Sequence, residues 1–215
     1  LLTCVIGPGA AGAAVITAKL GGDMETMISY TFLSTIVTAV MVPVAFPIVA
    51  PAADMPFWLS FPALLLKVGM VLLVPMAAAA VVKHRMPRLL RWINSMPDLS
   101  FYLWGLSLSI VTGFTVRNIV HATVTVWTLL AMALASMLLC LVQFAAGRWL
   151  GSCDGFTNEG GQALGQKNTS FAVWIAYTYL SPLSSVVPGC YILWQNAVNS
   201  FELWQHRRSH RLTNA

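Results

Sequence analysis

The sequence is short of charged residues. Of its 215 residues only 9% are charged and 58% are hydrophobic, and the mean hydropathy is +0.75. Soluble domains carry about 25% charged residues, so this chain lacks the polar surface that a water-facing globule needs. It therefore uses lipid as its solvent, and the bilayer is its first expected partner.

The motifs that mark many enzymes and metal sites are also missing. The sequence has no Ser/His/Asp set, no HExxH zinc motif and no Walker A loop. Its four cysteines show no CxxC spacing, which predicts apolar packing rather than metal binding. They are Cys4, Cys140, Cys153 and Cys190. We expect no enzyme, no cofactor and no nucleic-acid partner.

Apolar stretches occupy most of the chain. Most of them reach the roughly 20 residues that a membrane-spanning helix needs. Seven are expected, near residues 1–18, 26–49, 58–82, 99–117, 123–146, 163–180 and 183–204. Helices are the expected spanning element, because lipid offers backbone groups no hydrogen-bond partners. Short connections favour one all-α domain over residues 1–215, a polytopic helical bundle.

Basic residues gather on one side of these expected spans. Nine follow spans of the same direction: Lys19, Lys83, Arg85, Arg88, Arg91, Arg148, Arg207, Arg208 and Arg211. The opposite side holds only Arg117, which predicts a cytoplasmic C-terminus in a plasma or inner membrane. The basic tail "QHRRSHR" is interpreted as a topology signal, with binding to anionic lipid as a secondary effect. The chain starts with Leu inside an apolar stretch, so we expect that helices precede it.

Two of the apolar stretches contain residues that interrupt helices. The first holds Pro8 between Gly7 and Gly9, followed by Gly12, and the sixth holds glycines at 160, 161 and 165. The stretch "TNEGGQ" at residues 157–162, which contains the first two of these glycines, is interpreted as a loop. Inverted-repeat transporters place broken helices in corresponding positions and build their binding sites there. The alternative is that the glycines only permit close helix packing.

Three motifs resemble the bile acid:sodium symporter family. "GQKNTSFAVWIA" is similar to its Glu-x-Gly-x-Gln-Asn-[Ser/Thr] motif, "PGAAGAAVITAKLGGD" to its Pro-Gly-Gly segment, and "LWQNAVNS" to its Trp-His-Asn-x-x-Gly. The resemblance implies a ten-helix inverted-repeat fold whose fourth and ninth helices are broken and cross. This chain would supply helices four to ten. Its core spans would be about 1–49 and 99–204, with a panel-type span at about 58–82.

The resemblance also places the family's sodium ligands on residues that depart from the pattern. The sodium-binding Glu falls on Ala163, the ligand Gln on Lys167, the Ser-Asn pair on Ala13 and Ala14, and a hydroxyl position on Met27. Thr31 still matches a hydroxyl ligand, and Gln166 matches a residue that supplies a backbone carbonyl. Hard cations need several oxygen ligands, so sodium binding is left open. Pro8, Gly9, Gly12 and Gly165 are the expected crossover backbone.

Lys167 has three interpretations. Its ammonium could replace the sodium ion, with Thr31, Gln166 and Thr169 as candidate partners. It could instead extend to the membrane surface, as lysines near span ends do. It could also lose its proton in one access state and couple transport to H⁺. Glu159 could supply the missing carboxylate, although its flanking sequence predicts a loop.

The substrate-facing positions of the family are better matched. Asn168 and Asn196 align with its two asparagines, Gln195 stands in place of its His, and Thr169 follows Asn168. Helix N-termini at a crossover favour carboxylates or sulfonates. We therefore expect a secondary transporter of a bile-acid-like or smaller organic anion, coupled to Na⁺, to H⁺ or to neither. A membrane receptor or sensor that keeps the ligand cavity is the alternative, and the oligomeric state is left open.

Overall fold

The computed structural model describes residues 1–49, 57–96 and 99–213, and these ranges form helices with no strand. The elements are α1 (Leu2–Ile6), α2 (Gly12–Lys19), α3 (Met24–Val49), α4 (Phe57–Arg85), α5 (Pro87–Asn94), α6 (Leu99–Val120), α7 (Val126–Ser152), α8 (Thr157–Gly165), α9 (Thr169–Tyr179), the 3-10 turn η1 (Leu183–Ser185) and α10 (Val186–Thr213). The all-α prediction is confirmed.

The long apolar helices match the expected membrane spans. Within the described ranges, three helices are long and apolar enough to cross a bilayer, Met24–Val49, Trp58–Arg85 and Val126–Ser152, and Gly105–Val120 is a shorter apolar helix. They coincide with the stretches predicted near 26–49, 58–82, 123–146 and 99–117. The remaining three stretches are α10 and two interrupted helices. The chain is a polytopic integral membrane protein.

Two helices are broken, as the glycines and Pro8 predicted. Residues 7–11 separate α1 from α2, and residues 166–168 separate α8 from α9. One detail of the prediction is wrong, because "TNEGGQ" is not a loop: Thr157 starts α8, and Gly160 and Gly161 lie inside it. The second break therefore follows Gly165 and not the earlier glycines.

Close packing explains why a glycine occupies position 160 inside α8. A Cβ atom on Gly147 of α7 would lie 2.1 Å from the Gly160 carbonyl oxygen, and one on Gly160 would lie 2.2 Å from the Gly147 carbonyl oxygen. The two backbones touch because neither residue has a side chain. Gly160 thus has the packing role that was the alternative to helix breaking, and it holds α8 against α7.

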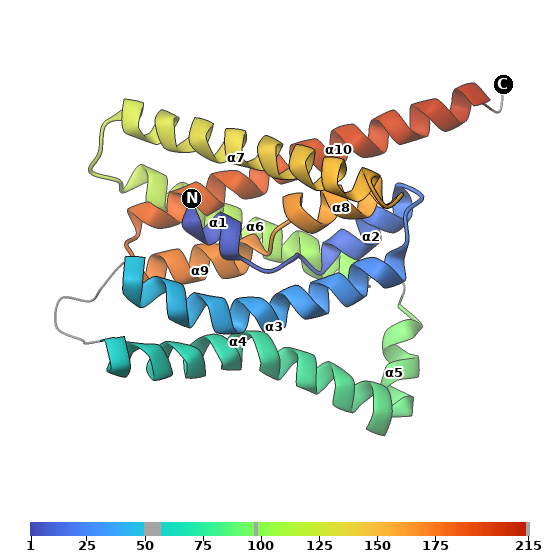
Figure 1. Cartoon of the computed structure of the whole chain (residues 1–215), viewed down its shortest axis with the longest axis horizontal. Coiled ribbons are helices and arrows are strands. Elements are labelled where there is room, and N and C mark those ends of the chain that lie inside the picture. The colour runs from blue at the N-terminus through green and yellow to red at the C-terminus, as the bar shows by residue number, and fades with distance from the viewer. Residues whose placement is uncertain (50–56, 97–98, 214–215) are drawn as a thin grey trace. The chain divides into compact units, whose positions relative to one another are not determined.

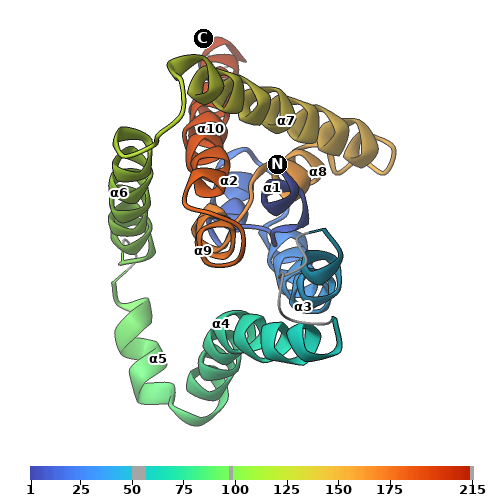
Figure 2. The same cartoon turned by 90° about the vertical axis from the view of Figure 1, so that its left-hand side faces the viewer.

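The described residues divide into two compact units. One comprises Leu1–Ser34 together with the chain from Val111 onward, and the other comprises Thr35–Ile110. In the first unit α1 packs on α9 and α2 packs on α8, while α10 contacts α7, α9, α1 and α2 (Figure 1). The end-on view shows α10 beside α9 and α2 (Figure 2). The expected single transporter domain would comprise both units.

Helix α5 lies between the spans predicted near residues 58–82 and 99–117, where only a connection was expected. Met86 leaves the helical conformation at φ −124° and ψ 63°, and Pro87 occupies the first turn of α5. A residue before proline is pushed out of the α region, and proline is well suited to a helix start. A separate short helix therefore follows α4, and it turns away from the end of α4 (Figure 1).

We expect Gly160→Ala to destabilise the protein by about 1–3 kcal/mol, because the new methyl group would overlap the α7 backbone. Gly113→Ala in α6 is the matched control. A Cβ atom there meets nothing within 4 Å, and alanine favours a helix by up to about 1 kcal/mol. Thermal unfolding in detergent should show a lower midpoint for Gly160→Ala only. Equal midpoints for the two variants would contradict the packing described.

Candidate binding site at the helix crossover

The two breaks in the first unit cross and pair with each other. The Asn168 N–H donates to the Pro8 carbonyl oxygen at 2.8 Å, and the Ala10 N–H donates to the Gln166 carbonyl oxygen at 3.0 Å. Gly9 and Lys167 face each other between these bonds as an antiparallel bridge. The unwound segments thus satisfy part of one another's backbone where lipid offers no substitute.

Side chains of neighbouring helices complete the crossover. The Gly9 N–H donates to Ser34 Oγ of α3 at 3.1 Å. On α10, Gln195 binds both backbone groups of Lys167. Its Oε1 accepts from the Lys167 N–H at 3.0 Å, and its Nε2 donates to the Lys167 carbonyl oxygen at 3.3 Å. Gln195 therefore fixes the peptide that carries the lysine.

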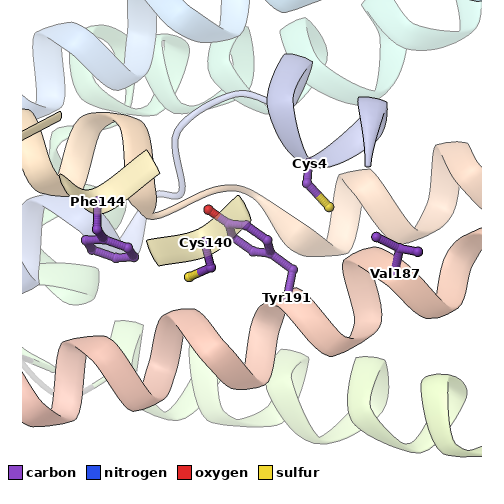
Figure 3. Packing of buried hydrophobic residues seen from close by; sticks show 5 residues of the cluster. All are labelled: Cys4, Cys140, Phe144, Val187 and Tyr191. Atoms are coloured by element: carbon purple, nitrogen blue, oxygen red, sulfur yellow. The ribbon is translucent and has the colours of Figure 1, made fainter. Parts of the chain in front are cut away.

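Tyr191, one turn before Gln195, holds the end of α8. Its hydroxyl lies 2.8 Å from the Gly165 carbonyl oxygen and 2.6 Å from Gln143 Oε1, and shares its hydrogen between the two acceptors. The tyrosine is fully buried beside Cys4 and Cys140, and Figure 3 shows its ring reaching between these two residues. Sequence reasoning missed Tyr191 and Gln143. Tyr191 precedes Gln195 by four residues, which predicts that both lie on the same face of a helix. This spacing alone does not predict their hydrogen-bond partners.

The residues predicted to bind substrate lie at or beside this crossing. The Asn168 side chain accepts from the Phe171 N–H at 3.2 Å and so caps α9. Thr169 is buried at the first position of that helix, whereas Asn196 is half-buried on α10 next to Gln195. Both α2 and α9 start at the crossing, at Gly12 and Thr169. Their N-termini give this place positive potential.

Four of the positions that the resemblance assigns to sodium ligands form an apolar cluster. Ala13, Ala14, Met27 and Ala163 are all buried and pack together, with Tyr30 against them. None of the four side chains carries an oxygen atom, so the cluster offers no side-chain ligand for a hard cation. The remaining hydroxyl of the set, Thr31, donates to the Met27 carbonyl oxygen of its own helix at 2.9 Å.

Lys167 lies among protein atoms, since only 6% of the residue is exposed. In the described part of the chain, no carboxylate pairs with its ammonium, and no hydrogen bond joins the ammonium to Thr31, Gln166 or Thr169. The backbone of Lys167 is therefore fixed at the crossing, and its buried side chain has no carboxylate partner among the described residues.

Glu159 is buried on α8, but it lies away from the crossing. Its carboxylate accepts a hydrogen bond from the Asp23 N–H in the turn between α2 and α3. The Asp23 carboxylate in turn accepts from the Thr26 hydroxyl at 2.6 Å and the Glu25 N–H at 2.9 Å, and these bonds lower the pKa of Asp23. Glu159 thus fastens the turn after α2 onto α8.

A cluster of polar side chains connects α8 with α7 and α10. Gln162 donates from Nε2 to Asn199 Oδ1 at 3.0 Å and to Glu202 Oε2 at 2.9 Å. Arg148 of α7 pairs with Glu202 Oε1 at 2.8 Å. Because Glu202 has both an ionic and a hydrogen-bonded partner, its burial is compensated, and the group holds the first half of the broken helix in place.

The sequence matches the model of one protein family. The model of the Sodium Bile acid symporter family matches residues 1–146, well over half of the chain. No curated protein matches the sequence. The match confirms the family that the motifs suggested, and of the three motifs it covers "PGAAGAAVITAKLGGD". Members of this family are transporters and not enzymes, which also confirms that expectation.

We expect Gln195→Leu to destabilise the protein by about 1–3 kcal/mol, because it leaves the buried Lys167 N–H without its partner. It also removes one of the two donors to the Lys167 carbonyl oxygen, which still accepts from the Thr169 N–H at 2.8 Å. Leucine preserves the approximate volume of the side chain, so a cavity does not account for the loss. Asn196→Leu, on the adjacent half-buried position, should change the free energy of unfolding much less. Chemical denaturation in detergent would measure both, and a Gln195→Leu protein as stable as wild type would refute the clamp.

Proposed function

The chain belongs to the Sodium Bile acid symporter family, and we propose that it is a secondary transporter of an organic anion that works without the family's sodium site. The observation that carries this proposal is the apolar cluster of Ala13, Ala14, Met27 and Ala163. The resemblance puts sodium ligands at these positions. Carbon and sulfur side chains do not replace the oxygen shell of Na⁺.

The charge at the crossover supports the same conclusion. Relative to the family motif, Ala163 removes one negative charge and Lys167 adds one positive charge. A unit positive charge about 6 Å from Na⁺ repels it by about 3 kcal/mol at an effective dielectric constant of 20. The affinity for Na⁺ would therefore fall more than a hundredfold from the lysine alone, before the missing ligands are counted.

The same charge makes the crossing suitable for an anion. The N-termini of α2 and α9 and the Lys167 ammonium all add positive potential there, and no described carboxylate pairs with the lysine. Asn168 and Thr169 offer amide and hydroxyl groups beside it, with Asn196 on the neighbouring helix. A carboxylate or sulfonate on a bile-acid-like or smaller organic molecule is the substrate class that this chemistry favours.

Lys167 is proposed to supply the positive charge that a bound ion supplies in sodium-coupled relatives. Because it is covalently attached, this charge needs no ion gradient, and transport would then follow the gradient of the anion alone. A lysine that releases its proton in one access state would instead couple transport to H⁺. The proposed orientation, from the distribution of basic residues, places the C-terminus in the cytoplasm.

Uptake by the full-length protein in proteoliposomes tests the proposal. We expect a radiolabelled bile acid to accumulate equally with Na⁺ or K⁺ outside, and Lys167→Ala to reduce the initial rate at least tenfold. Lys67→Ala is the control, since Lys67 is an exposed lysine within α4. Na⁺-stimulated accumulation by the wild-type protein would overturn the proposal. An imposed pH gradient separates H⁺ coupling from uncoupled transport, and binding without flux would favour a sensor.

A further inference from the structure

Helix α5 is strongly amphipathic. At 100° per residue, Trp92, Leu89, Ile93 and Leu90 occupy one continuous side of the helix, and the opposite side carries its two arginines. No residue of α5 is buried, and Trp92 is 61% exposed. The apolar side of this helix is therefore only partly covered by the unit to which it belongs.

The same stretch is basic and contains no acidic residue. Lys83, His84 and Arg85 end α4, and Arg88 and Arg91 follow on α5. All five are exposed. The sequence has no Asp or Glu between Asp54 and Asp98, so no acidic residue nearby in the sequence offsets these charges. The surface has the charge that complements an anion.

The position of α5 identifies what covers its apolar side. Helix α4 is long and apolar enough to cross the bilayer and ends at Arg85, so its end lies at the membrane surface. Helix α5 begins two residues later and turns away from α4 (Figure 1). A short helix at the end of a span, apolar on one side and basic on the other, lies in the headgroup region. Trp92, at the edge of the apolar side, is typical of that depth.

We propose that α5 and the end of α4 form a binding site for the head groups of anionic phospholipids. The apolar side of α5 enters the interface, and Arg88 and Arg91 contact lipid phosphate groups, with Lys83 and Arg85 beside them. Each basic residue near an anionic membrane surface contributes to such binding. The site would hold the end of α4 at the bilayer surface. It does not depend on the proposed transport function.

Titration of the detergent-solubilised full-length protein with fluorescent phosphatidylglycerol tests this site. We expect Arg88→Gln/Arg91→Gln to weaken binding at least fivefold. Arg207→Gln/Arg208→Gln, which removes the same charge from the exposed end of α10, should change it less than twofold. Equal weakening by the two pairs would mean attraction by net charge alone and would overturn the proposal.

Further measurements distinguish binding of a lipid from binding of a free anion. Trp92→Gln keeps every charge but removes the largest apolar side chain, so it should also weaken lipid binding. Inorganic phosphate at millimolar concentration should compete poorly, and phosphatidylcholine should bind at least tenfold more weakly. An unchanged affinity in Trp92→Gln, or full competition by phosphate, would contradict a site in the membrane interface. Unchanged thermal midpoints would show that the variants remain folded.

Discussion

The pairing of the two broken helices is the constraint on which the first unit depends. A break inside a membrane span exposes backbone groups that lipid cannot satisfy. Here Pro8 and Ala10 bond to Asn168 and Gln166, so each break supplies partners for the other. Because the crossing point is fixed, α1 lies on α9 and α2 lies on α8. Helix α10 then fastens the second break through Tyr191 and Gln195.

In the proposed account, this arrangement brings positive charge to one point from groups of the chain itself. Two helix N-termini and Lys167 meet where the segments cross. Four nearby positions that the resemblance assigns to sodium ligands carry alanine and methionine side chains. In the proposed account, a lysine and apolar packing replace a metal ion and its oxygen shell. A site that in a sodium-coupled relative is completed by its ion would in this chain be complete beforehand.

The sequence predicts the membrane spans well because hydropathy over about 20 residues is a strong signal. Proline and glycine also indicate the breaks, but glycine alone does not locate them. Gly160 packs against Gly147, and that role depends on a partner thirteen residues away in the chain. Helix α5 is too short to be recognised as a span. The contacts of Gln195 with Lys167 could not be predicted, because they arise only once α10 lies beside the crossing.

Hydrogen exchange at the crossing tests the central claim most directly. In the full-length protein reconstituted in nanodiscs, the amides of Ala10 and Asn168 lie outside regular helix but are hydrogen-bonded across the two breaks. We predict that they exchange at least a hundredfold more slowly than the amides of the loop at residues 123–125. Exchange of both amides as fast as in that loop would contradict the pairing of the two segments.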